Sequence, residues 1–128
     1  MKKVPNISEA EWEVMKVLWK RNPMTAQEII CELRETEWHP KTVKTLIARL
    51  VKKGAVGYKS EGRTYLYSPL IKEKSSVIRE TQSLLDRLFG GSLAPMVAQF
   101  VESKKLSNEE LDELSRILKL SDSSKNED

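Results

Sequence analysis

One signal for the start of a helix occurs three times in this chain. In each case a serine or threonine is followed three residues later by a glutamate, and apolar residues flank the pair. The hydroxyl can accept a hydrogen bond from a free amide of the first turn, and the glutamate can return one. The pairs are Ser8 and Glu11, Thr25 and Glu28, and Ser107 and Glu110. They predict three helix starts in a chain that is mainly α-helical.

A further helix is predicted from Pro40 to Lys53. Proline suits the first helical position because its missing N–H would be unpaired there, and Gly54 is a favourable residue to end a helix. Apolar residues recur at helical spacing, which defines one buried stripe: Val43, Leu46, Ile47 and Leu50. We expect it to pack on apolar residues of the two preceding helices, namely Ala10, Val14, Val17, Leu18, Ala26, Ile29, Ile30 and Leu33.

After Gly54 the pattern changes to alternation rich in tyrosine around the turn dipeptide Glu61-Gly62, and Pro69 follows. Such a pattern is typical of a β-hairpin. Three helices followed by a hairpin is the order of a winged helix-turn-helix, whose third helix enters the DNA major groove. We therefore predict a winged-helix DNA-binding domain over residues 1–70, with the hairpin as its wing.

The outer face of the predicted third helix carries basic and hydroxyl side chains, and no acidic residue occurs from Lys41 to Lys53. These groups bond phosphates, and Arg or Lys can also read guanine edges. An ordinary solvated helix would interleave Glu with Lys. In the hairpin, two cations flank the turn and could reach the DNA backbone. The predicted DNA contacts are Lys41, Thr42, Lys44, Thr45, Arg49, Lys52, Lys59 and Arg63.

Charge is distributed unevenly between the two halves. Up to Ser68 the chain has 13 basic and 8 acidic residues, whereas the remainder has 9 basic and 11 acidic ones. The first half is thus the one suited to a polyanion, although a basic surface by itself is weak support for nucleic-acid binding.

For the second half of the chain, the apolar pattern predicts a three-helix domain over 71–121. A polar tail over 122–128 follows, which we expect to be disordered. A core of this size is marginal without disulfides, metal or oligomerisation, so we expect a homodimer. The residues predicted to form the dimer are Val77, Leu84, Leu88, Met96, Phe100, Leu111, Leu114, Ile117 and Leu118.

The sequence lacks the residues that metal sites, disulfides and common catalytic sites require. Cys31 is the only cysteine and His39 the only histidine, so we expect no disulfide, no metal and no cofactor. Cys31 has no histidine partner in view, and the sequence has no glycine-rich phosphate loop, so we predict that the protein is not an enzyme. The apolar runs are far shorter than the ~20 residues that span a bilayer, which favours a cytoplasmic protein.

Three segments carry a resemblance to a known family: SEAEWEVMKVLW (Ser8–Trp19), PKTVKTLIARLVKKGAV (Pro40–Val56) and EGRTYLYSP (Glu61–Pro69). In length and order, nearly the whole chain resembles the penicillinase repressor family of β-lactamase and methicillin-resistance repressors. The resemblance implies a homodimer on dyad-symmetric operators of a β-lactamase gene and its regulatory genes. It also implies derepression by β-lactams through a membrane sensor with a protease domain.

In that family the sensor pathway triggers cleavage just before a phenylalanine of the second C-terminal helix. The resemblance implies cleavage between Gln99 and Phe100 here, although relatives often carry Asn at the position of Gln99. Phe100 also fits the buried stripe of its own helix, which is an alternative role for it.

Two other functions stay open at this point. Copper-responsive repressors of the same fold resemble the first half, but they carry paired cysteines near the C-terminus, where this chain has neither Cys nor His. A helical protein-interaction module would leave the basic helix as an incidental surface, and its DNA binding would be weak and insensitive to salt.

Overall fold

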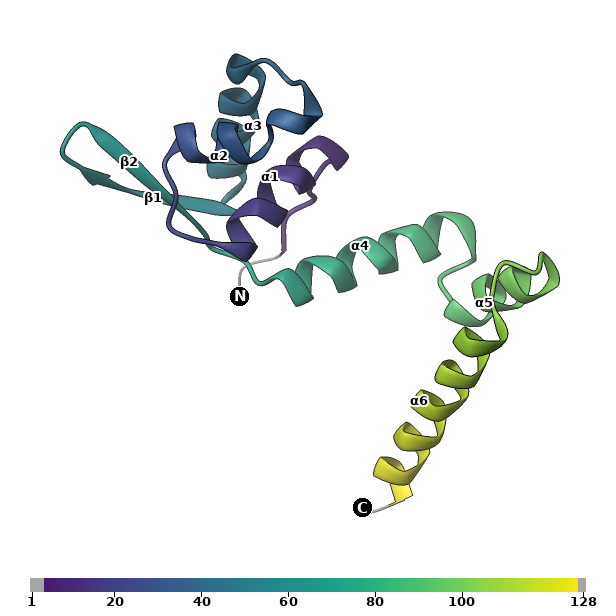
Figure 1. Ribbon diagram of the computed structural model, residues 1–128. Helices are drawn as coiled ribbons and strands as arrows, with labels where there is room; N and C mark the ends of the chain where they lie inside the picture. Colours follow the sequence, from purple (N-terminus) through teal and green to yellow (C-terminus); the bar gives the residue numbers. More distant parts are fainter. Residues whose placement is uncertain (1–3, 127–128) are drawn as a thin grey trace. The chain divides into compact units, whose positions relative to one another are not determined.

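The computed structural model describes residues 4–126 (Figure 1). In chain order its elements are α1 (Glu9–Lys20), α2 (Ala26–Glu32), the 3-10 helix η1 (Arg34–Thr36), α3 (Pro40–Lys53), β1 (Val56–Glu61), β2 (Thr64–Pro69), α4 (Glu73–Leu88), α5 (Leu93–Glu102) and α6 (Asn108–Asn126). This order confirms a mainly α-helical fold with a winged helix-turn-helix first and three helices after it. The contacts divide the chain into two units, with the division between Gln82 and Ser83.

The helix starts form as the capping signals predict. Ser8 Oγ accepts from the Glu11 amide at 3.1 Å, and Glu11 Oε1 accepts from the Ser8 amide at 2.8 Å. Thr25 and Glu28 make the same reciprocal pair at 3.1 and 3.0 Å. Each capping side chain stabilises its helix by about 1 kcal/mol. These caps fix where α1 and α2 begin, and hence which faces they turn to the core.

The core of the N-terminal unit lies where α1, α2 and α3 pack together (Figure 1). The predicted stripe of α3 is buried, as are Val14 and Leu18 of α1 and Ile29 of α2. Other predicted partners, such as Ala26 and Ile30, are half-buried at its edge. The core also takes in residues that the sequence did not assign to it: Ile7, Met24, Ala55 and Val56.

The hairpin is antiparallel, with Val56 opposite Pro69 and Glu61 opposite Thr64. Gly62 occupies the turn with a φ of +65°, a conformation that glycine adopts without strain. The hairpin extends away from the three helices (Figure 1). Its base is held to the start of α2 because Met24 and Tyr67 exchange backbone hydrogen bonds of 3.0 and 2.7 Å.

The division between the units falls inside α4, whereas the sequence placed it after residue 70. The junction before α4 is bonded into the N-terminal unit, because the Trp19 indole donates to the Ile71 carbonyl at 3.0 Å and Ser76 is buried. The helix α6 continues to Asn126, so it includes residues 122–126 of the predicted polar tail. No proline or glycine follows Leu120 to end the helix. Residues 127–128 lie outside the described residues.

None of the helices in the described range is long and apolar enough to cross a membrane.

Candidate nucleic-acid interface

The candidate interface begins with the exposed face of α3. All six predicted contacts on this helix are exposed, while its apolar stripe is buried in the core. The start of α3 is held by His39, whose Nδ1 accepts from the Lys41 amide at 3.1 Å, and Pro40 follows at the first helical position. Gly54 ends the helix with a φ of +82°. A rigid helix therefore presents an uninterrupted basic face to solvent.

Thr45 and Arg49 lie one turn apart on this face. The Thr45 hydroxyl donates to the Lys41 carbonyl at 3.0 Å, so its proton is engaged within the helix and its oxygen can still accept a hydrogen bond. Within residues 4–126 the Arg49 guanidinium has no ion-pair partner. Such a guanidinium can donate two parallel bonds to guanine or to a phosphate.

Lys53, the last residue of α3, has a different role from its basic neighbours. Its Nζ donates to the Asn6 carbonyl at 2.9 Å and to Oε1 of Glu11, a carboxylate that is only 1% exposed. Burial would raise the pKa of the Glu11 carboxyl, but hydrogen bonds from Lys53 and Ser8 outweigh it and lower this pKa below 4.5. The ion pair ties the end of α3 to the start of α1 and positions the basic face.

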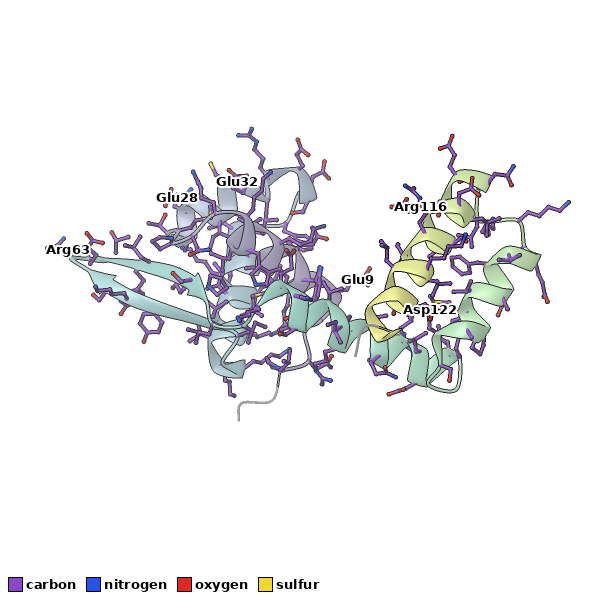
Figure 2. The ribbon with its side chains drawn as sticks, turned by 90° about the horizontal axis from the view of Figure 1, so that it is seen from below. Glu9, Glu28, Glu32, Arg63, Arg116 and Asp122 are labelled. Carbon is purple, nitrogen blue, oxygen red and sulfur yellow. The ribbon has the colours of Figure 1, made fainter. Side chains whose placement is uncertain are left out.

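The two predicted cations of the hairpin lie in different places, Lys59 within β1 and Arg63 in the turn. Lys59 is opposite Leu66, one residue out of phase with the pair Tyr58 and Tyr67, so it points to the other side of the hairpin from the tyrosines. Tyr65 joins that tyrosine face, with its ring 4.8 Å from Tyr58 and 6.5 Å from Tyr67. Arg63 extends from the hairpin tip (Figure 2).

A hollow of about 430 Å³ lies between α2, α3 and the tyrosine face of the hairpin. It is lined by Thr25, Ala26, Gln27, Lys44, Arg63, Thr64, Tyr65 and Tyr67. The hollow brings two of the predicted contacts together, Lys44 from α3 and Arg63 from the hairpin turn. The sequence assigned none of its other polar members to DNA binding.

All the predicted dimer residues except Val77 lie in the C-terminal unit, and most of these are exposed to solvent instead of buried in a core. Phe100, Ile117 and Leu118 are at least 45% exposed, and Leu88 is also exposed. Between α5 and α6 lies an apolar groove of about 360 Å³, lined by Leu93, Met96, Val97, Phe100, Leu106, Glu110, Glu113, Leu114 and Ile117. Val77 and Leu111 are exposed and Leu84 is half-buried, but none of the three lines this groove.

The bond between Gln99 and Phe100 lies within α5, and both residues are exposed. The Gln99 carbonyl accepts from the Ser103 amide at 3.0 Å, and the Phe100 carbonyl accepts from the Lys105 amide at 2.9 Å. Cys31 is an exposed free thiol. Across the described range, no cluster of His, Cys, Asp and Glu is arranged to hold a metal ion.

Comparison with known proteins places this arrangement in a family. The model of the penicillinase repressor family matches residues 7–120. This chain belongs to that family. A penicillinase repressor of Bacillus licheniformis is 46% identical over 119 residues, which cover 92% of this chain and 93% of the relative. The methicillin resistance regulatory protein MecI of Staphylococcus aureus strain N315 is 36% identical over 117 residues, covering 91% of this chain and 95% of that protein.

Solved structures of family members match the N-terminal unit. The DNA-binding domain of the repressor BlaI in solution is 50% identical with a TM-score of 0.52, covering 59% of this chain and 93% of that domain. The monomeric form of Bacillus licheniformis BlaI in complex with the blaP half-operator is also 50% identical, with a TM-score of 0.51 and the same coverage. The first of these structures is a DNA-binding domain, and the chain shares its fold.

Sequence reasoning missed the hollow because its members come from three separate stretches of the chain. The packing of α2 on α3 and the bonds between Met24 and Tyr67 bring these stretches together. The available signal was the alternation of tyrosines in the hairpin, which shows that they share one face. The face itself could not be matched to α2 without the structure.

Proposed function

We propose that this member of the penicillinase repressor family is a cytoplasmic, homodimeric transcriptional repressor. It binds dyad-symmetric operators of a β-lactamase gene and its regulatory genes. The exposed face of α3 is the observation that carries the proposal, because six basic or hydroxyl side chains share it without an acid. The side chains that bind the operator are Lys41, Thr42, Lys44, Thr45, Arg49, Lys52, Lys59 and Arg63.

The homodimer forms through the C-terminal helices. Large apolar side chains exposed on α4, α5 and α6 support this, because exposed apolar patches mark surfaces that are covered in an assembly. A dimer with two-fold symmetry fits a dyad-symmetric operator, with half-sites one or more helical turns apart. The dimer residues predicted above form the interface, extended by the exposed Leu93, Val101 and Leu120.

Repression ends when β-lactam sensing at the membrane leads to proteolysis between Gln99 and Phe100. The position of this bond in the C-terminal unit supports the proposal. Cutting α5 would separate the parts of the dimer interface that precede and follow the bond. Two linked half-site contacts raise affinity by about 10²- to 10⁴-fold over one, and this gain is lost with the dimer. The cleaved repressor would then leave its operator.

The first experiment is selection of bound fragments from host DNA by the purified protein, at near-physiological salt. We expect enrichment of a few dyad-symmetric sites beside β-lactamase and sensor genes. On such a site, log K should fall with log salt at a slope near −5 to −7 if roughly six to eight phosphates are neutralised. A slope near zero would exclude DNA binding, and sites beside unrelated genes would change the proposed signal.

Two substitutions then test the proposed roles. Arg49→Ala should lower affinity for the selected site about 10- to 100-fold and relax sequence preference at one position. Lys16→Ala, which removes an exposed cation from α1 of the same unit, should leave both unchanged. Leu114→Asp should convert dimer to monomer in sedimentation and weaken operator binding at the same time. A tight dimer in this variant would place the interface elsewhere.

A further inference from the structure

We propose that Lys44 of α3 and Arg63 of the hairpin turn bind one and the same phosphate of the DNA backbone, in the hollow between α2, α3 and the hairpin. The proposal rests on the proposed DNA binding and assigns this hollow as a phosphate site within it. It links the helix that reads the major groove to the hairpin through a single ligand group.

The lining of the hollow suits an anion. Two cations come from separate elements, and the other polar residues of the lining are uncharged: Thr25, Gln27, Thr64, Tyr65 and Tyr67. No acidic residue contributes to its lining. Arginine, lysine, hydroxyl and amide groups are the side chains that most often bond phosphate oxygens.

The charge of the hollow is not neutralised from within the protein. In the part of the chain that the structure describes, neither Lys44 nor Arg63 has an ion-pair partner. The nearby carboxylate of Glu28 is engaged elsewhere, because its Oε1 accepts from the Thr25 amide and its Oε2 lies 3.5 Å from Arg21. The positive charges of Lys44 and Arg63 are therefore available to bind an anionic ligand.

The walls of the hollow are fixed before DNA binds. The backbone bonds between Met24 and Tyr67 hold β2 beside the start of α2. Contacts among the rings of Tyr58, Tyr65 and Tyr67 stiffen the hairpin face that forms one wall. Preorganised walls reduce the ordering cost of binding, which favours a defined phosphate site over a diffuse basic surface.

A shared phosphate has a consequence that two separate phosphate contacts lack. A phosphodiester has one negative charge and two free oxygens, so each cation can bond one oxygen. Loss of either cation then weakens the same contact. The effects of removing both should fall short of the product of the single effects, because residues that share a ligand group are energetically coupled.

The test uses the full chain and a short duplex taken from the host-DNA selection, with single phosphates replaced by neutral methylphosphonates in turn. Wild type should lose about tenfold in affinity when the shared phosphate is neutralised. Lys44→Gln and Arg63→Gln should each lose affinity on the unmodified duplex, by up to about tenfold, and become less sensitive to neutralisation at that same position. Circular dichroism and thermal unfolding check that each variant is folded.

Lys59→Gln is the matched control, because Lys59 is a hairpin cation that does not line the hollow. This variant should keep the wild-type sensitivity at the shared position. If Lys44→Gln and Arg63→Gln lose sensitivity at two different positions, or if their effects multiply in the double variant, the shared site is overturned while DNA binding stands. If wild type binds no duplex, the proposed function falls and the phosphate site with it.

Discussion

The two units of this chain bury their apolar side chains to very different extents. In the N-terminal unit Val14, Met15, Leu18, Ile29 and Leu50 are completely inaccessible to solvent. In the described part of the C-terminal unit, the one buried large apolar side chain is that of Leu85, at 6% exposed. Both units are mostly helical, so their difference in burial comes from how many neighbouring elements each helix packs against.

The comparison teaches that the first unit encloses its apolar core within one chain, whereas the second leaves large apolar side chains exposed. Three helices and a hairpin enclose a core, but α5 and α6 leave an open apolar groove between them. The exposed large apolar residues of the C-terminal unit are Leu88, Leu93, Phe100, Val101, Leu111, Ile117, Leu118 and Leu120. A winged-helix unit with its own core, joined to helices with exposed apolar faces, is consistent with the proposed repressor, which leaves its operator when its dimer is cut.

The largest effect should separate Leu50→Ala from Leu118→Ala. Leu50 is fully buried, so its truncation leaves a cavity and should lower the free energy of unfolding by about 3 kcal/mol at every protein concentration. Leu118 is 67% exposed in the single chain, so its truncation should have little effect on the monomer. In a dimer it should weaken association, and its cost should appear only at high concentration. Denaturant unfolding monitored over a range of protein concentrations measures both.

Equal, concentration-independent losses for the two variants would break the comparison, since Leu118 would then be buried within its own chain. Ile117→Ala provides a second truncation on the same helix, at a residue that lines the groove. It should follow Leu118→Ala in its dependence on concentration.

Much of the N-terminal unit could be predicted because its signals are local. The reciprocal caps at Ser8 and Thr25 and the bounds of α3 at Pro40 and Gly54 depend on residues a few positions apart. The stripe of α3 follows from helical spacing alone. The exposed basic residues of α3 can be predicted because they lie on the face opposite this stripe.

Long-range partners could not be predicted in the same way. Nothing in the sequence shows that Lys53 binds Glu11, 42 positions earlier, instead of joining the basic face of α3. The hollow at Lys44 depends on the register of the hairpin against Met24, which a sequence pattern does not specify. The end of α6 is not specified by sequence either, because the polar residues after Leu120 are compatible both with a disordered tail and with an exposed helix.

An intermediate effect should come from Glu11→Gln. The pKa of Glu11 is lowered in the folded state, so its charge stabilises the protein fully above pH 4.5, and this contribution is lost as pH falls through the folded-state value. At neutral pH the variant should lose about 2 kcal/mol, near the lower end for a broken buried pair because the Lys53 side chain is 34% exposed. Thermal unfolding from pH 7 to pH 3 should show the two proteins converging in acid.

Glu28→Gln is the matched control, since Glu28 occupies the same capping position in α2 but is exposed. It should give a smaller loss at neutral pH and leave most of the acid dependence in place. Both groups of the Glu11 pair lie in the N-terminal unit, so the convergence should not depend on protein concentration. Parallel curves for wild type and Glu11→Gln down to pH 3 would mean that the ion pair does not stabilise the fold.

The smallest effect tests where the N-terminal unit ends. Ser76 of α4 is 1% exposed, and its hydroxyl has no hydrogen-bond partner within residues 4–126. Ser76→Ala should therefore stabilise the protein by about 1 kcal/mol, because it removes the cost of a buried unpaired hydroxyl. Ser75→Ala is the control, because it gives the same gain in helix propensity at a half-buried neighbour. The difference in stability between the two variants therefore measures the cost of burying the Ser76 hydroxyl. The extra gain should be independent of protein concentration, because α4 up to Gln82 belongs to the N-terminal unit. Equal gains for the two variants would show that the Ser76 hydroxyl is satisfied, and a concentration-dependent gain would assign this turn of α4 to the dimerising half.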